Sequence, residues 1–291
     1  MIITRLKGGM GNQMFQYALG RALSLKYNVP LGFDLSFLLE TTPRLNFTFR
    51  NYDLDVFNIK AEIVSSGKVP FVNRVFKGKV GQIFDYLRRY FSFNKGVEKS
   101  WDFDPSILSI GPDTYLDGYW QNPKYFENIE DIIRSDFTLK DKLSLNIENL
   151  KEVIEKENSL CIHVRRGDYV GNKNHEVVGE KYYKEGIEKM KSLVKIDKIY
   201  VFSDDIKWCE ENMRFDFPIM FVGEEYAGQK AEGHLILMSS CKNFIIPNST
   251  FAWWGAWLSI NKDKKVIVPQ KWFPFMITND NDIVPKEWIK I

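Results

Sequence analysis

The segment Cys161-Ile162-His163-Val164-Arg165-Arg166-Gly167-Asp168-Tyr169-Val170 is a short apolar strand that runs into two arginines, a glycine and an acid. Where a strand leaves the carboxyl edge of an α/β sheet, the chain enters the crevice in which such folds hold ligands. An arginine fork makes two parallel charge-assisted hydrogen bonds to phosphate oxygens. Gly167 permits close backbone approach, and Asp168 can orient either arginine. The segment predicts a diphosphate site, and an arginine–aspartate pair that fastens a loop is the alternative.

The sequence after residue 145 alternates apolar strands with helical patterns, which predicts a parallel sheet with helices on both faces. The expected strands are Leu160–Val164, Lys198–Phe202, Ile219–Val222, Asn243–Pro247 and Val266–Pro269. The expected helices are Leu145–Glu157, Lys181–Val194, Ile206–Met213, Gly233–Ser240 and Phe251–Ile260. In the first half we expect strands Met1–Leu6, Leu31–Asp34 and Tyr115–Asp117 and a helix Met14–Tyr27. The change of pattern divides the chain into domains 1–144 and 145–291.

Polar residues follow two further strands of the second half. Ser203, Asp204 and Asp205 follow one strand, and Asn248, Ser249 and Thr250 follow another and open a helix. Carboxyl ends of parallel strands share one edge, and a helix N-terminus there favours a phosphate. Ser249 or Thr250 can also serve as the helix N-cap. An acid pair such as Asp204 and Asp205 could hold a metal ion, but Arg165 and the helix terminus already offer positive potential, so we expect no metal.

A glycine-rich turn, Lys7-Gly8-Gly9-Met10-Gly11-Asn12-Gln13, follows the first strand. Such a loop before a helix presents backbone N–H groups to an anion or a sugar hydroxyl. It lacks the closing Gly-Lys-Ser/Thr of a Walker loop and the spacing of a dinucleotide fingerprint. A plain tight turn fits these residues equally well.

Composition narrows the class of protein. The chain has 291 residues, 44% hydrophobic and 27% charged, as in ordinary soluble domains. A net charge of +2 provides no global field for nucleic acid, so no nucleic-acid partner is expected. Cys161, Cys209 and Cys241 are too scattered for a disulfide framework and indicate a reducing compartment. Neither a signal peptide nor a membrane-spanning run is visible, so we expect a cytoplasmic protein.

The stretch Ser65–Lys95 is strongly basic, with aromatic residues interleaved among its lysines and arginines. A basic amphipathic surface of this kind attracts anionic lipid. Such a surface would allow peripheral contact with the inner face of the plasma membrane. A packed helix with a solvated basic face is the other interpretation, and these residues favour it somewhat more.

Three motifs resemble those of the bacterial α-1,2-fucosyltransferases, which form glycosyltransferase family 11. The motifs are Gly8-Gly9-Met10-Gly11-Asn12-Gln13-Met14-Phe15-Gln16-Tyr17-Ala18, His163-Val164-Arg165-Arg166-Gly167-Asp168-Tyr169 and Asn248-Ser249-Thr250-Phe251-Ala252-Trp253-Trp254-Gly255-Ala256-Trp257. Gly118-Tyr119-Trp120-Gln121 and Leu237-Met238-Ser239-Ser240-Cys241-Lys242 also match. The resemblance therefore runs over nearly the whole chain.

This resemblance implies an α/β, GT-B-like glycosyltransferase with two Rossmann-like domains that face a central cleft. The N-terminal domain would lie on the acceptor side, and the C-terminal domain would bind the donor. The implied enzyme is inverting and metal-independent. It would move L-fucose from GDP-L-fucose to the 2-hydroxyl of a galactose-terminated oligosaccharide or lipid-linked glycan, in surface polysaccharide such as O-antigen.

The resemblance also implies roles for single residues. Arg165 would grip the donor diphosphate and offset charge on the departing GDP, and Asp168 would hold its orientation, which makes these two the catalytic candidates. The other residues expected to bind the donor from the second domain are His163, Arg166, Ser203, Asp204, Ser249, Thr250 and Phe251. The glycine loop at Gly9, Gly11, Asn12 and Gln13 would close on the donor from the first domain. A general base is not identifiable.

Two positions depart from the family pattern. His234, with Glu232 nearby, stands where the family usually has an aspartate thought to read guanine, and Asn243 stands where a histidine is common. These departures keep two other hypotheses open. One is a transferase that uses another GDP-deoxysugar, and the other is a non-catalytic module that binds a nucleotide sugar or a glycan.

Overall fold

The structure is a computed structural model that describes residues 1–40, 48–64, 93–167, 171, 178–273 and 282–291. Most of the basic stretch, at 65–92, and the predicted catalytic residue Asp168 lie outside the described residues. The chain divides into two compact units, Met1–Thr138 (unit 1) and Leu139–Ile291 (unit 2). The boundary predicted between residues 144 and 145 lies a short way beyond this division.

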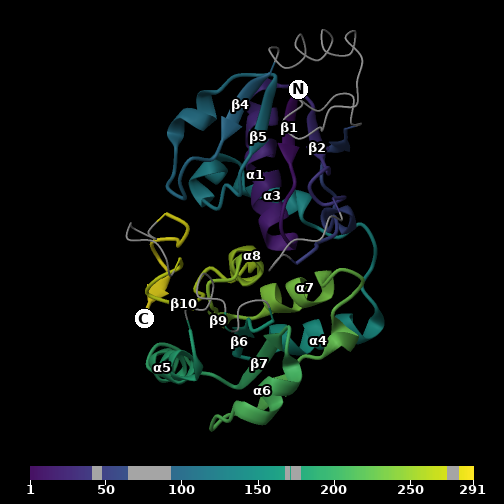
Figure 1. Ribbon diagram of the computed structural model, residues 1–291. Coiled ribbons are helices and arrows are strands. Elements are labelled where there is room, and N and C mark those ends of the chain that lie inside the picture. The colour runs from purple at the N-terminus through teal and green to yellow at the C-terminus, as the bar shows by residue number, and fades with distance from the viewer. Residues whose placement is uncertain (41–47, 65–92, 168–170, 172–177, 274–281) are drawn as a thin grey trace. The chain divides into compact units, whose positions relative to one another are not determined.

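Unit 1 is built on a parallel sheet whose strand order is β3-β2-β1-β5-β4. Its strands are β1 (Ile2–Arg5), β2 (Leu31–Asp34), β3 (Glu62–Ile63), β4 (Asn94–Val97) and β5 (Thr114–Asp117). The order reverses between β1 and β5, and ligand crevices open at the carboxyl ends of strands at such a point. In Figure 1 the helix α1 (Met10–Tyr27) runs beside these strands.

Helix α1 begins earlier than the predicted Met14, because Gly9 takes an extended conformation at its N-cap and the chain turns at once into the helix. Asn28 ends the helix in the left-handed conformation, with φ 51°. The Tyr17 hydroxyl donates to Asp136 at 2.6 Å, and Nε of Arg21 contacts the same carboxylate at 2.9 Å. This buried group fastens α1 to α3 (Glu130–Asp136).

Unit 2 contains a second parallel sheet, with the order β11-β10-β9-β6-β7-β8 in the described residues. Its strands are β6 (Ser159–Val164), β7 (Lys198–Ser203), β8 (Ile219–Phe221), β9 (Asn243–Ile245), β10 (Val266–Val268) and β11 (Ile289–Lys290). Counted along the chain from β6 and read from β8, this is the order 3-2-1-4-5-6 of the Rossmann fold. The switch point therefore lies between β6 and β9.

The helices of unit 2 follow the strands as the sequence predicts. They are α4 (Leu145–Lys156), α5 (Glu180–Lys191), α6 (Ile206–Asn212), α7 (Glu232–Ser240) and α8 (Thr250–Leu258). The predicted alternation of strands and helices is thus confirmed, with ends shifted by a few residues. All six residues of β6 are buried, which explains why its sequence does not alternate between apolar and exposed polar residues.

The core of unit 2 also contains Trp253 and Trp254 of α8, both with an exposed fraction of 0%. The indole of Trp253 donates to the carbonyl of Ile283 at 2.8 Å, so its polar atom is satisfied within the core. The three cysteines are buried and free. In the portion of the chain that the structure describes, no helix has the length and apolar character needed to cross a membrane.

Candidate functional site

The carboxyl ends of β6 and β7 bring the predicted arginines and acids together. Val164 pairs with Ser203 in the parallel register, so the residues that follow each strand lie side by side. Nη1 of Arg165 lies 3.0 Å from Oδ2 of Asp204, and Nε of Arg166 lies 3.1 Å from Oδ2 of Asp205. Each arginine thus has its own carboxylate partner on the neighbouring strand end.

Asp204 fixes the orientation of Arg165. Its second oxygen accepts the backbone N–H of Arg166 at 2.9 Å, so the carboxylate is held on both sides. Gly167 allows this arrangement, since a Cβ atom there would lie 2.4 Å from Oδ2 of Asp204. The orienting role expected of Asp168 lies outside the described residues and stays a prediction, as does donor binding by Asp204. The contact between Asp204 and Arg165 is an addition to these expectations, and the acid pair that follows the neighbouring strand could have signalled it.

Arg166 is engaged with α6. Its guanidinium carbon lies 3.7 Å from the centre of the Trp208 ring, close enough for a cation–π contact. Oδ1 of Asp205 accepts the backbone N–H of Trp208 at 3.2 Å and so caps the helix. The Ser203 hydroxyl accepts the N–H of Asp205 at 3.0 Å. Arg166 and Ser203, both expected to bind the donor, therefore also brace this strand end against α6.

His163 is a buried neutral imidazole near the end of β6. Its exposed fraction is 5%, and burial, followed by the nearby charges of Arg165 and His234, lowers its pKa to about 3. Its ring centre lies 6.1 Å from that of Phe251 on α8. Nδ1 of His163 has no hydrogen-bond partner among the described residues. The strand end thus offers an uncharged ring nitrogen beside an aromatic side chain.

The N-terminus of α8 lies at the switch point, because β9 pairs with β6 through Ile245 and Ile162. Ser249 is the N-cap, and its hydroxyl accepts the N–H of Ala252 at 3.5 Å. Thr250 is the first residue of the helix. The positive end of the helix dipole favours an anion at this edge of the sheet. The capping role and the expected phosphate role are compatible.

Asp204 and Asp205 are bound to arginine side chains and backbone N–H groups, which gives both carboxylates partners other than a metal ion. Across the described ranges, no group of three or more His, Cys, Asp or Glu residues is arranged to hold one. Each of these acids thus has a cationic partner, and the expectation that no metal is needed stays a prediction.

The residues that depart from the family pattern have structural contacts. Nε2 of His234 donates to the carbonyl of Gly223 at 2.9 Å, and its ring packs edge-on against Phe202. Oδ1 of Asn243 accepts the backbone N–H of Lys265 at 2.9 Å. Glu232 accepts the N–H groups of Gln229 and Lys230 at 2.9 and 2.7 Å. These contacts stabilise loops of unit 2.

The glycine loop belongs to unit 1. Gly8 has a φ of 74°, and Gly9 is the N-cap of α1, which places Gly11, Asn12 and Gln13 in the first turn. Nε2 of Gln13 donates to the carbonyls of Gly8 and Asn51, and its Oε1 accepts the N–H of Asp53 at 2.9 Å. Oδ1 of Asn12 accepts from Gln121 at 3.0 Å. The closure of this loop on the donor stays a prediction.

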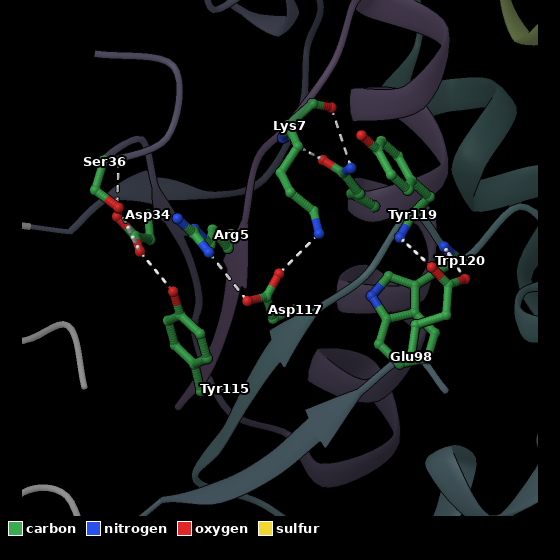
Figure 2. A network of polar contacts seen from close by, with 10 residues as sticks. Arg5, Lys7, Asp34, Ser36, Glu98, Tyr115, Asp117, Tyr119 and Trp120 are labelled. Carbon is green, nitrogen blue, oxygen red and sulfur yellow. Dashed lines mark hydrogen bonds and ion pairs between the residues drawn. The ribbon is translucent and has the colours of Figure 1, made fainter. Parts of the chain in front are cut away.

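A second polar network, which sequence reasoning missed, lies at the carboxyl edge of unit 1 (Figure 2). Arg5 and Lys7, at the end of β1, both contact Asp117 at the end of β5, at 3.1 and 2.8 Å. Glu98 directly follows β4 and binds the turn after β5. The only signal for it in the sequence was the aromatic loop Gly118-Tyr119-Trp120-Gln121.

Comparison with known proteins identifies a family model and relatives that match this chain. The model of Glycosyl transferase family 11 matches residues 92–291. An alpha-1,2-colitosyltransferase of Escherichia coli is 35% identical over 100% of this chain and 99% of its own length. The O-antigen biosynthesis glycosyltransferase WbnK of Escherichia coli is 32% identical over 98% of this chain and 99% of its own. A galactoside 2-alpha-L-fucosyltransferase of Caenorhabditis elegans is 26% identical over 90% of this chain and 70% of its own.

Among solved structures, the fucosyltransferase NodZ from Bradyrhizobium is similar in fold. The TM-score is 0.51 at 16% sequence identity, over 87% of this chain and 91% of that one. This likeness and the two parallel sheets confirm the predicted α/β, GT-B-like class. The family match covers well over half of the sequence, and the colitosyltransferase aligns from end to end. This chain therefore belongs to glycosyltransferase family 11.

Proposed function

We propose that the chain is an inverting transferase that moves a deoxysugar from a GDP-linked donor to the 2-hydroxyl of a galactose or similar sugar in a surface polysaccharide. The observation that carries the proposal is the Arg165–Asp204 pair at the carboxyl ends of β6 and β7, in a Rossmann-ordered sheet whose switch point lies between β6 and β9. Helix α8 begins after β9, at the same edge of the sheet. Family membership and the printed names of the relatives, which include α-1,2-colitosyl and 2-α-L-fucosyl transfer, support the reaction.

The chemistry of the step requires such a site. Breaking a glycosyl–phosphate bond builds positive charge on the sugar and negative charge on the departing diphosphate. Arg165 and the N-terminus of α8 would offset the negative charge, and a preorganised group of this kind supplies several kcal/mol of the barrier reduction. Asp204 keeps Arg165 in place before the donor arrives, so little reorganisation accompanies the reaction. Asp168, when bound to either arginine, would add to this orientation.

The donor sugar is either L-fucose, as the motifs imply, or colitose, as the first relative's name favours. Colitose is L-fucose without its 3-hydroxyl. A site that hydrogen-bonds this hydroxyl rejects the deoxy analogue strongly, whereas an apolar site rejects the extra hydroxyl only weakly. Comparing kcat/KM for GDP-L-fucose and GDP-colitose therefore decides between the two donors, and it also shows which kind of site this chain has.

The remaining expectations concern the acceptor and its location. WbnK is named for O-antigen biosynthesis, which supports a galactose-containing or lipid-linked surface glycan as the acceptor. Contact with the inner membrane face is a proposal that rests on the basic stretch Ser65–Lys95. Co-sedimentation of the protein with anionic vesicles at low salt tests it, and a protein that stays in the supernatant contradicts it.

The first experiment measures GDP release from both donors, with lactose as acceptor and EDTA present. The wild type is compared with Arg165→Ala and with Arg214→Ala, a matched control on the exposed surface of unit 2. We expect wild-type and control turnover to be equal and Arg165→Ala to be slower by about 100-fold or more, because one preorganised charge-stabilising group is lost.

Full turnover in Arg165→Ala would contradict the role of the arginine, and activity abolished by EDTA would contradict the metal-independent step. Titration of the wild type with GDP is the accompanying measurement. A protein that does not bind GDP would exclude the whole proposal, and it would do so independently of the choice of acceptor.

A further inference from the structure

The turn Gly118–Trp120 after β5 adopts an unfavourable conformation. Trp120 has a φ of 57°, in the left-handed region that bulky residues avoid. Its side chain is 1% exposed, and its indole N–H has no hydrogen-bond partner among the described residues. A Cβ on Gly118 would lie 2.6 Å from the Trp120 ring, so the chain is tightly folded here. Backbone strain of this kind persists only where surrounding structure holds it, and it gathers at functional sites.

Glu98 holds this turn in place (Figure 2). Its Oε2 accepts the backbone N–H of Tyr119 at 2.7 Å, and its Oε1 accepts that of Trp120 at 2.8 Å. Burial raises the pKa of Glu98, while the two N–H groups and Lys7 oppose the shift. Both oxygens of a largely buried carboxyl are thus used to fix two successive backbone groups. The turn must therefore keep one shape.

The side chain that this turn positions is Tyr119. Its ring stacks on Trp101, with ring centres 5.6 Å apart and planes inclined by 15°. Nζ of Lys7 lies 4.9 Å from the centre of the Tyr119 ring. Trp101 and Tyr119 both remain partly exposed. The structure thus gathers an aromatic pair and an ammonium group where the sheet meets solvent.

Lys7 and Asp117 are likewise fixed and partly exposed. Oδ1 of Asp117 accepts from Lys7 at 2.8 Å, and its Oδ2 accepts from Arg5 at 3.1 Å. The side chains of Lys7 and Asp117 are 16% and 19% exposed. In the network of Figure 2, two cations, Arg5 and Lys7, lie beside three acids, Asp34, Glu98 and Asp117. These residues therefore provide no excess positive charge that would favour a phosphate.

Aromatic rings beside fixed donors and acceptors, without excess positive charge, suit a neutral polyhydroxylated ring. Sugar rings present C–H faces to aromatic side chains and hydroxyls to charged or amide groups, in the general manner of sites with a few well-placed polar atoms. The position also fits, because β1 and β5 flank the point at which the strand order of this sheet reverses.

We propose that the carboxyl edge of unit 1 binds a neutral pyranose through Lys7, Asp117, Tyr119 and Trp101, with Glu98 as a positioning residue that holds the turn. The identification of this sugar as the acceptor rests on the function proposed above, whereas the sugar site itself does not. The site would read hydroxyls with the Lys7–Asp117 pair and stack the sugar against the aromatic side chains.

Saturation-transfer NMR on the full chain tests the site directly. The probes are methyl β-galactoside, methyl β-glucoside, methyl N-acetyl-β-galactosaminide and galactose 6-phosphate. The variants are Lys7→Met and Tyr119→Ala. The chain offers a matched control pair, Lys26→Met and Tyr27→Ala, since Nζ of Lys26 lies 5.5 Å from the centre of the Tyr27 ring at the C-terminal end of α1. That end of the helix leads into β2 and so lies at the amino edge of the sheet.

We expect at least one neutral glycoside to bind to the wild type and to both controls. Binding should weaken about tenfold or more in Lys7→Met and Tyr119→Ala, because a contact to a charged group or an aromatic face is lost. Trp101→Ala is the second aromatic variant, to be used if Tyr119→Ala unfolds in circular dichroism. Galactose 6-phosphate should bind no more tightly than the neutral galactoside.

The proposal is overturned if no neutral glycoside binds to the wild type, or if Lys7→Met and the folded aromatic variant bind it unchanged. Preference for galactose 6-phosphate would also overturn it, since the edge would then be an anion site. Arg165→Ala, in unit 2, should retain glycoside binding. If the proposed transferase function is wrong, GDP titration will show no binding, whatever the result with the glycosides. Failure of the sugar site and failure of the transferase function are therefore distinguishable.

Discussion

The two parallel sheets place charged side chains at their carboxyl edges in different ways. In unit 1 two cations share one carboxylate, because Arg5 and Lys7 both contact Asp117. In unit 2 each arginine has its own partner, Asp204 for Arg165 and Asp205 for Arg166. At both edges the cations named here are paired with carboxylates. The pairing of charges by itself therefore does not explain why one edge would hold a diphosphate and the other a neutral sugar.

What differs is the geometry of the cations and their neighbours. Unit 2 presents planar arginine forks after β6 and a helix N-terminus after the neighbouring β9, at the same edge of the sheet, and both kinds of group suit phosphate oxygens. Unit 1 presents the lysine beside a stacked aromatic pair, held by a strained turn. The comparison teaches that orientation rather than charge separates the two edges. Removing an orienting carboxylate should then impair turnover more than binding.

Among the changes that test this comparison of the two edges, Asp204→Asn has the largest expected effect. The amide oxygen can still accept the N–H of Arg166, but the charge that holds Arg165 at 3.0 Å is lost. We expect kcat to fall by up to about 100-fold, the scale of a small misplacement of a reacting group. Affinity for GDP should stay equal or rise, because a negative charge has left the site. Steady-state kinetics and GDP titration measure the two effects.

Asp216→Asn, at an exposed position of unit 2, is the control for this change. A parallel loss of kcat and of GDP affinity would show that Asp204 contacts the donor rather than orienting Arg165. In that outcome the two edges would differ in binding contacts, and the contrast drawn from orientation would fail.

The strands and helices of unit 2 were predicted from the sequence more completely than those of unit 1. The elements from β6 to β10 were predictable because the strands are buried apolar runs and Gly, Asn and Ser separate them from the helices. The location of Arg165 and Ser249 at the same edge of the sheet was also predictable, because the carboxyl ends of parallel strands lie at one edge. The contact of Arg165 with Asp204 was not predictable, because Asp204 becomes adjacent to Arg165 only through the β6–β7 register.

The sugar site of unit 1 was beyond sequence reasoning for a physical reason. β4 reads Asn94-Lys95-Gly96-Val97, and only Gly96 is buried, so no apolar alternation marks it as a strand. Yet its pairing with β5, Val97 opposite Asp117, is what brings Glu98 to the turn at Tyr119. The aromatic loop could be recognised in the sequence. The contact by which Glu98 holds it depends on the β4–β5 register, which these residues do not specify locally.

The next largest expected effect is on the pH dependence of stability, and it comes from His163 in unit 2. The pKa of His163 falls from 6.5 to about 3 in the folded protein, so between these values only the unfolded chain binds this proton. The stability that the neutral His163 ring contributes is fully present above pH 6.5. It is lost as the pH falls towards 3, by at most about 1.4 kcal/mol per pH unit. Thermal unfolding of His163→Phe should show a shallower loss than the wild type between pH 6 and 4. Equal slopes would mean that the ring takes up its proton at the same pH in the folded and the unfolded chain.

Glu98→Gln should give the smallest effect, with the opposite dependence on pH. One N–H of the turn loses its acceptor, so the free energy of unfolding should fall by about 1 kcal/mol. The pKa of Glu98 is raised above its ordinary 4.5, so the stability it contributes is complete below that value and is lost as the pH rises through the folded pKa. Denaturant unfolding should therefore show a larger difference between wild type and variant at pH 4 than at pH 7. A larger difference at pH 7 would mean that the turn needs the charged carboxylate, and the edge of unit 1 would then depend on charge as well as on shape.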